Sequence, residues 1–213
     1  FCAFRFAPLL HKTRAALNAA ELNVSHIKES AVINNSHTDL LESHTTEEIK
    51  SLLLATSTIL SSHEIVKSMV LGRTKFSFLI GFGYGGDKYS EEYQTDVLVR
   101  DKSPLIASAK YLAEHYEAIS SADVMGIVAL RSLRNDIAHN LPAVLTKYDL
   151  ESLKSHVSKA RDLVFKLDNF WMYIDIGHDP EHRGTNWDTA YSNATMFVDR
   201  LVELNEENID RNG

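Results

Sequence analysis

The sequence predicts an all-α fold, an antiparallel helical bundle of about six helices with one long insertion rich in glycine and tyrosine. In several long stretches, apolar residues recur every three and four positions, which is the spacing of a helix that buries one face. This spacing disappears between residues 72 and 102, where five of the nine glycines gather. We expect a single domain over residues 1–213, with its core at about residues 103–175 and the insertion at about residues 72–102.

Composition describes an ordinary globular protein. The 213 residues are 44% hydrophobic and 9% aromatic, and a chain of this length needs neither disulfide nor metal to stabilise a core. The single Cys2 cannot form an internal bridge. The first ten residues include Arg5 and Pro8 and are followed by no small-residue cleavage site, so we expect no signal peptide. No apolar run is long enough to span a bilayer, and we expect a soluble, cytoplasmic protein without membrane contact.

Charge is unevenly distributed along the chain. The net charge of −7 argues against wrapping nucleic acid through general electrostatics. Residues 131–166 nevertheless hold seven Lys/Arg against four Asp/Glu, a local balance of +3 that leaves −10 for the remainder. This split fits a local phosphate-binding site on an acidic body, and it also fits a solvated helix face.

The first half of the chain predicts two helices and an irregular segment. Apolar or small residues at helical spacing indicate a helix over residues 8–33, and a turn follows at 34–37. Thr45 and Glu48 form a capping-box pattern that begins a helix running to about Leu71. The Ser and Thr residues at 56–62 weaken helix propensity there and allow a bend. Residues 72–102 predict a long loop or a small hairpin, with β-leaning residues at 97–99.

Residues 81–86 match the Gly-x-Gly-x-x-Gly dinucleotide fingerprint in form only. A pyrophosphate loop needs a helix N-terminus directly after it, and the residues that follow are polar and without helical pattern. We therefore favour a connector or a flap that contacts a partner over nucleotide binding at this loop.

The second half predicts four helices. Ser103 with Pro104 begins the first, and Ser120 or Ser121 caps the second, which should end near Leu141 because a proline follows. A strict three-four alternation over residues 150–174 predicts a long bundle helix, and after a loop at 177–186 a last helix is expected over about 188–206.

Residues 130–142 carry the polar groups that most suggest chemistry. On a helical wheel of about 100° per residue, one face is apolar and the other carries a polar stripe, with Arg134 at the border. The apolar face consists of Leu130, Leu133, Ile137 and Leu141, and the polar stripe of Arg131, Asn135 and His139. This helix can bury one side in a bundle and still offer a guanidinium, an amide and an imidazole to a ligand.

The string from Arg134 to His139 resembles the signature of the HEPN superfamily, in which an Arg is followed after four to six residues by a His, often with a polar residue straight after the Arg. Asn135 fills that polar position, the segment ends a helix, and a long bundle helix follows. The resemblance covers about residues 103–175. HEPN toxins that are paired with nucleotidyltransferase antitoxins have the pattern His-x-Tyr at the motif histidine. Here Asn140 and Leu141 follow His139, so the resemblance does not imply regulation by such an antitoxin.

The resemblance implies a metal-independent endoribonuclease, a hydrolase without cofactor that acts in a toxin–antitoxin or phage-defence setting. Such an enzyme would cut RNA by attack of the ribose 2′-OH. It would be a homodimer whose two motif helices meet, with RNA as substrate and a cognate antitoxin or other protein as a partner. Arg134, Asn135 and His139 would be catalytic, with Asn135 orienting the site and Arg131 as a substrate-binding phosphate contact.

The residue types fit this chemistry on physical grounds. Metal-free RNA cleavage needs a base, an acid and a cation facing the phosphorane. His139, near the negative end of its helix dipole, favours the imidazolium form, and Arg134 stays charged and can grip phosphate with two N–H groups. Their offset of five residues separates them by about 140° on the wheel, too wide for one helical face, so we expect a second chain to complete the site.

Other interpretations stay open. Arg134 and Asn135 could bond helix-end carbonyls while His139 caps its own helix, which would make the segment a polar seam between packed helices. A non-catalytic HEPN-like module that uses this helix for dimerisation, or to bind a nucleotide or partner, is the alternative function. Residues 178–182 offer four metal-ligand side chains, but Pro180 prevents a helical alignment and we expect no metal there.

Overall fold

The computed structural model describes residue 42 and residues 44–210. The helix predicted over residues 8–33, the turn at 34–37 and Cys2 lie outside the described residues.

The described part is an all-α helical bundle, as predicted, with one small sheet. Its helices are α2 (Thr46–Lys67), α3 (Arg73–Ser77), α4 (Pro104–His115), α5 (Ser121–Lys147), α6 (Leu150–Ile176) and α7 (Asn193–Asp210). Strands β1 (Leu79–Gly83) and β2 (Gly86–Tyr89) pair antiparallel. Short helical turns are the π-helices η1 (Ser68–Gly72) and η2 (Tyr93–Val97) and the 3-10 turns η3 (Leu98–Arg100), η4 (Pro180–His182) and η5 (Trp187–Thr189).

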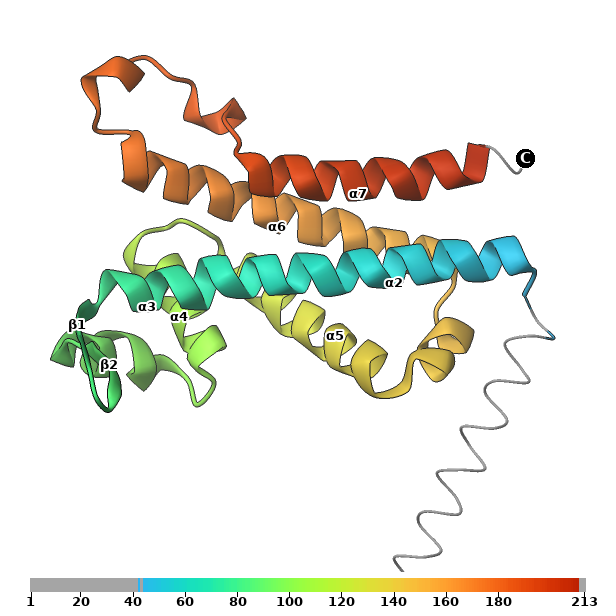
Figure 1. Ribbon diagram of the computed structural model, residues 1–213, viewed down its shortest axis with the longest axis horizontal. Helices are drawn as coiled ribbons and strands as arrows, with labels where there is room; N and C mark the ends of the chain where they lie inside the picture. The colour runs from blue at the N-terminus through green and yellow to red at the C-terminus, as the bar shows by residue number, and fades with distance from the viewer. Residues whose placement is uncertain (1–41, 43, 211–213) are drawn as a thin grey trace, which may run out of the picture.

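Helix α2 lies at the centre of the arrangement, in contact with α5, α6 and α7. Figure 1 shows α2, α6 and α7 extending along the long axis, with α5 running below α2 and the hairpin at the far end of α3. One hydrophobic cluster joins these helices, with Leu52, Ile59, Leu153 and Leu167 among its fully buried members. No helix within residues 44–210 is both long and apolar enough to cross a bilayer.

The Ser/Thr-rich stretch of α2 is part of the core and does not interrupt the helix. The capping box at Thr45 is present, with the Glu48 N–H donating to Thr45 Oγ1 at 3.2 Å. The Thr56 and Thr58 hydroxyls donate to backbone carbonyls three and four residues earlier in α2, at 2.9 Å each. Because their polarity is satisfied locally, these small side chains can be buried. The α-helix continues through residues 56–62 without interruption, and the first change of helix type is η1.

The prediction for residues 72–102 was wrong at both ends and right in the middle. The helical path resumes after η1 as α3, so the helical pattern continues to Ser77. The hairpin is present between Leu79 and Tyr89. Residues 97–99, predicted to favour β-structure, instead lie in η2 and η3, because Val97 is fully buried in a small cluster with Tyr93 and Tyr111. Packing there overrides the local β-propensity.

The later helices agree closely with the sequence. The capping box of α5 uses Ser120, with Asp123 as its partner, and α6 covers the predicted bundle helix. Most of its stripe is buried, but Ile174 near its end is 40% exposed. The last helix begins at Asn193, later than the expected 188, because η5 occupies residues 187–189.

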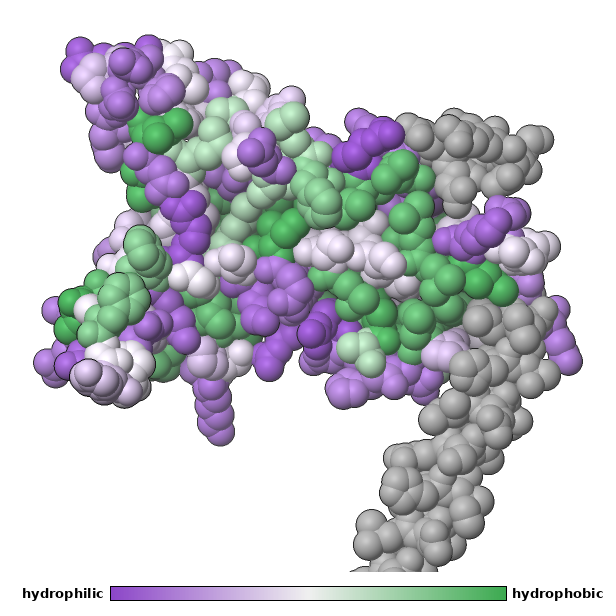
Figure 2. Space-filling view, in the orientation of Figure 1, coloured by the Kyte–Doolittle hydropathy of each residue, from purple (hydrophilic) through white to green (hydrophobic). Residues whose placement is uncertain are grey.

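A partly open apolar surface remains on α2 and α7. Figure 2 shows apolar side chains gathered over the N-terminal half of α2 and between α2 and α7. Leu53 of α2 is 38% exposed, and Phe197 of α7 is 51% exposed. The bundle therefore leaves part of its apolar face uncovered among the described residues.

The start of α7 is held by a buried carboxylate of α6. Asp168 is only 5% exposed and accepts from the Ser192 hydroxyl at 2.6 Å and from the Thr195 hydroxyl at 2.6 Å. The backbone N–H groups of the same two residues also donate to it, at 2.9 and 3.3 Å. Asp168 thereby caps α7 from outside the helix and attaches it to α6.

We predict that Asp168→Ala lowers the free energy of unfolding by about 2–4 kcal/mol, because it leaves buried donors without an acceptor. Urea unfolding followed by circular dichroism measures this. Asp162→Ala is the matched control, since its side chain lies on the same helix and is 62% exposed. Equal losses for the two variants would contradict the capping role.

Candidate functional site

The motif helix breaks where the sequence predicted an end, but helical structure resumes. Asn140 leaves the helical region, with φ −151° and ψ 68°, and divides α5 into two segments. Its side-chain oxygen accepts from the Ala143 N–H at 3.3 Å, so Asn140 caps the second segment, and Pro142 lies in that segment's first turn. The helix that begins at Ser121 therefore ends where the sequence predicted, and Pro142 lies in a second helical segment that reaches Lys147 and was not predicted.

The two faces predicted for this helix are present. Leu130, Leu133 and Ile137 are buried, with exposed fractions of 5% or less. Arg131 and His139 are exposed, whereas Arg134 and Asn135 are half-buried. The polar groups of the motif are thus carried by a helix whose opposite side is anchored in the core.

Arg134 faces the C-terminal part of α2. Its Nη2 lies 3.5 Å from Glu64 Oε1, and its Nη1 lies 3.4 Å from the Asn135 side-chain oxygen. Glu64 also accepts from Lys67 Nζ at 3.1 Å and lies 3.2 Å from His63 Nδ1. An acidic group of another helix therefore stands next to the predicted phosphate-binding cation.

His139 lies in different surroundings. It lines a hollow of about 270 Å³ together with Asp136 and residues of the second segment, among them Lys147 and Tyr148. No hydrogen bond or ion pair between the described residues joins His139 to Arg134. Arg131 points elsewhere again, since its Nη1 donates to Ser103 Oγ of the α4 N-cap at 2.8 Å. Of the four predicted site residues, only Arg134 and Asn135 contact each other. Arg131 bonds Ser103, and His139 lines the hollow beside Lys147.

His63 is a site residue that sequence reasoning missed. Its side chain is buried, its Nε2 has no hydrogen-bond partner among the described residues, and burial lowers its pKa, an effect that Glu64 partly opposes. Nothing in the sequence could link His63 or Glu64 to Arg134, because the contact spans 70 residues and depends on how α2 packs on α5. Buried polar groups are ordinarily hydrogen-bonded, and the buried ring of His63 departs from this rule at Nε2. The departure can be recognised only from the fold.

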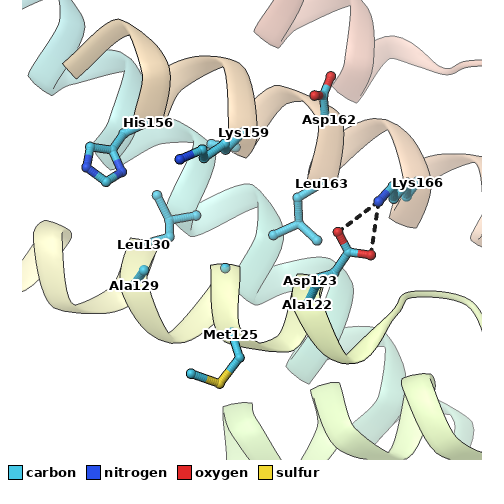
Figure 3. Close-up of a pocket in the computed structure, with 12 residues that line it drawn as sticks. Ala122, Asp123, Met125, Ala129, Leu130, His156, Lys159, Asp162, Leu163 and Lys166 are labelled. Atoms are coloured by element: carbon cyan, nitrogen blue, oxygen red, sulfur yellow. Dashed lines mark hydrogen bonds and ion pairs between the residues drawn. The ribbon is translucent and has the colours of Figure 1, made fainter. Parts of the chain in front are cut away.

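A groove of about 430 Å³ separates α5 from α6. Figure 3 shows Leu130 and Leu163 directed into the space between the helices, while Lys166 of α6 reaches across to Asp123 of α5. That ion pair measures 2.8 Å. On the α5 side the groove is lined by the small residues Ala122, Gly126 and Ala129. The groove therefore offers both apolar side chains and charged groups, among them Lys159, to a ligand or a partner.

The remaining candidates do not gather into sites. Residues 81–86 lie in β1, the hairpin turn and the start of β2, so no helix N-terminus follows the glycines. In residues 178–182, η4 turns the chain, and His178 packs against the ring of Tyr173 at 5.5 Å. Within the described part of the chain, no three His, Cys, Asp or Glu side chains are placed to hold a metal ion. Trp171 is buried in the core.

Comparisons with protein-family models, curated proteins and solved structures gave no match to this chain.

The buried imidazole of His63 predicts a pH dependence of stability. Its pKa in the folded chain lies below the value of about 6.5 expected in the unfolded chain, so the unfolded chain binds the proton more readily. The contribution of His63 is therefore complete above about pH 6.5 and is lost as the pH falls toward the lowered pKa. We expect the free energy of unfolding to fall less between about pH 7.5 and about pH 5.5 in His63→Gln than in the wild type. Urea unfolding at both pH values measures it, and an identical fall in both proteins would contradict this assignment.

Proposed function

We propose that this protein is a metal-independent endoribonuclease of the HEPN type, acting as a toxin or phage-defence effector. The observation that carries the proposal is the Arg134-Asn135 pair followed by His139 on one helix, anchored in the core on one side and accessible on the other. A guanidinium, an amide and an imidazole are the groups that cleavage of RNA without a metal requires.

In the proposed reaction the ribose 2′-oxygen attacks the adjacent phosphorus, and the bond from phosphorus to the 5′-oxygen breaks. His139 moves the proton that leaves the 2′-OH or enters the 5′-oxygen, Arg134 stabilises the charge of the phosphorane, and Asn135 orients the reacting groups. Arg131 supplies a further phosphate contact. The products are a cyclic phosphate and a 5′-hydroxyl end, and no cofactor takes part.

We further propose that two chains build each site, in a homodimer whose motif helices meet. The support is the separation of the two residues within one chain: Arg134 faces Glu64 of α2, whereas His139 lines the hollow beside Lys147. A two-fold axis near α5 would bring the Arg134 of one protomer toward the His139 of its partner.

The direct test is incubation of the purified protein with RNA in EDTA. We expect cleavage by the wild type, and a loss of rate of about 10²- to 10⁴-fold in Arg134→Ala and in His139→Ala. Arg183→Ala and His182→Ala are the matched controls, because they remove the same side-chain types from the loop between α6 and α7. Absent cleavage, or equal cleavage in all variants, rules out the nuclease.

Mixing the two inactive variants tests the two-chain site. If Arg134 of one protomer acts with His139 of the other, half of the re-formed dimers are mixed and each regains one intact site, so about a quarter of wild-type activity returns. No recovery, with dimer exchange verified by light scattering or fluorescence transfer, would show that the two residues act within one chain.

The alternative function is a non-catalytic module of the same fold that binds a partner protein or a nucleotide. Two observations favour it: Glu64 already stands beside Arg134, and the groove between α5 and α6 offers an apolar surface to a partner. A dimer or complex that forms normally but leaves RNA intact in the same assay supports this alternative.

A further inference from the structure

We propose that Glu64 of α2 is the resident counter-ion of Arg134, which an RNA phosphodiester must displace, and that His63 is the positioning residue that holds the Glu64 carboxylate in place. This inference rests on the proposed function, because it takes Arg134 to be the phosphate-binding group.

The geometry places one carboxylate oxygen between two helices. Glu64 Oε1 lies 3.2 Å from His63 Nδ1 and 3.5 Å from Arg134 Nη2, while Oε2 accepts from Lys67 Nζ at 3.1 Å. Oε1 is therefore shared between a group of its own helix and the guanidinium of α5. A phosphodiester presents two oxygens to the same planar donor edge, and can form two parallel bonds with it.

Glu64 is charged under physiological conditions. The hydrogen bond from Lys67 lowers its pKa most, desolvation is the next largest effect and raises it, and the bond with His63 lowers it again, so that the pKa lies below its ordinary value. The side chain of Glu64 is half exposed, and that of Arg134 is 37% exposed. Solvent reaches both partners, so the contact is weak enough for a phosphate to replace it.

His63 explains why the carboxylate stays on the Arg134 side. Its ring is only 5% exposed, and its Nε2 has no partner among the described residues. With a proton on Nδ1, the neutral ring donates to Glu64 and leaves Nε2 as an unused acceptor. Burial leaves Nε2 of His63 without a hydrogen-bond partner among the described residues, while Nδ1 holds the Glu64 carboxylate beside Arg134. His63 therefore has a positioning role.

The substrate class follows from this arrangement. An uncharged ligand cannot replace a carboxylate on a guanidinium, whereas a phosphodiester carries the same charge and stronger bidentate geometry. The Glu64 contact therefore selects anionic ligands and keeps the guanidinium beside α2 until one binds.

The experiment is a binding cycle with an RNA oligonucleotide that carries 2′-O-methyl groups and cannot be cleaved by 2′-OH attack. Fluorescence anisotropy gives its affinity for the wild type, Glu64→Gln, Arg134→Ala and the double variant. Glu47→Gln is the matched control, since Glu47 lies on the same helix, is 46% exposed and pairs with Lys50. It removes the same charge without touching Arg134.

We expect Glu64→Gln to bind the oligonucleotide about two- to fivefold more tightly than Glu47→Gln does, the range of an exposed ion pair. The gain should disappear when Arg134 is replaced by Ala. Equal affinities for Glu64→Gln and Glu47→Gln, a gain that persists in the Arg134→Ala background, weaker binding by Glu64→Gln, or no measurable binding by any variant each overturns the proposal.

Two His63 variants test the positioning role. His63→Leu keeps an apolar volume but removes the donor, so it should shift affinity in the same direction as Glu64→Gln. His63→Gln retains a donor amide and should restore wild-type affinity. A purely structural role would change the unfolding midpoint of both variants without this split in affinity.

The two proposals fail separately. If the affinities show no coupling between Glu64 and Arg134 but the wild type cleaves RNA, the counter-ion proposal fails and the nuclease proposal stands. If the affinities show a clear coupling but unmodified RNA is not cleaved, the counter-ion proposal stands and the nuclease proposal fails.

Discussion

Burial of α2 among α5, α6 and α7 is the interaction on which the rest of the structure depends. Ala55 and Ile59 are completely buried, and Thr56 and Thr58 nearly so. The small side chains allow other helices to approach closely, and their hydroxyls bond carbonyls of their own helix, so close packing leaves these polar groups satisfied. Asn205 of α7 uses the same surface, donating to the Thr58 hydroxyl at 2.9 Å.

The position of α2 also decides the electrostatics of the motif. Because α2 packs against α5, His63 and Glu64 in the C-terminal part of α2 lie beside Arg134. The guanidinium therefore does not face open solvent on a basic surface. It faces a carboxylate within an acidic protein of net charge −7, and any phosphate that binds there must compete with that carboxylate.

The geometry of α5 bears on assembly as well as on chemistry. The break at Asn140 redirects the chain after His139, and the hollow beside His139 is bounded by the segment that follows the break. Arg134 meanwhile remains against α2. A single chain thus presents the two groups to different surroundings, and the proposed two-chain site would bring them together.

The sequence by itself determined the fold class, the caps at Thr45 and Ser120, the course of α6 and the placement of the motif on a half-buried helix. These features depend on signals that act within a few residues: capping side chains, apolar spacing and the effect of proline. The same local signals failed at residues 97–99, where burial of Val97 in a tertiary cluster produced helical turns in a β-leaning segment.

Only the tertiary structure decided that His63 and Glu64 lie beside Arg134 and that Asp168 caps α7. Each of these depends on side chains brought together from different helices, or on the direction of a helix face relative to its neighbours. Such contacts are set by the packing of the whole core, which no local pattern of residues encodes.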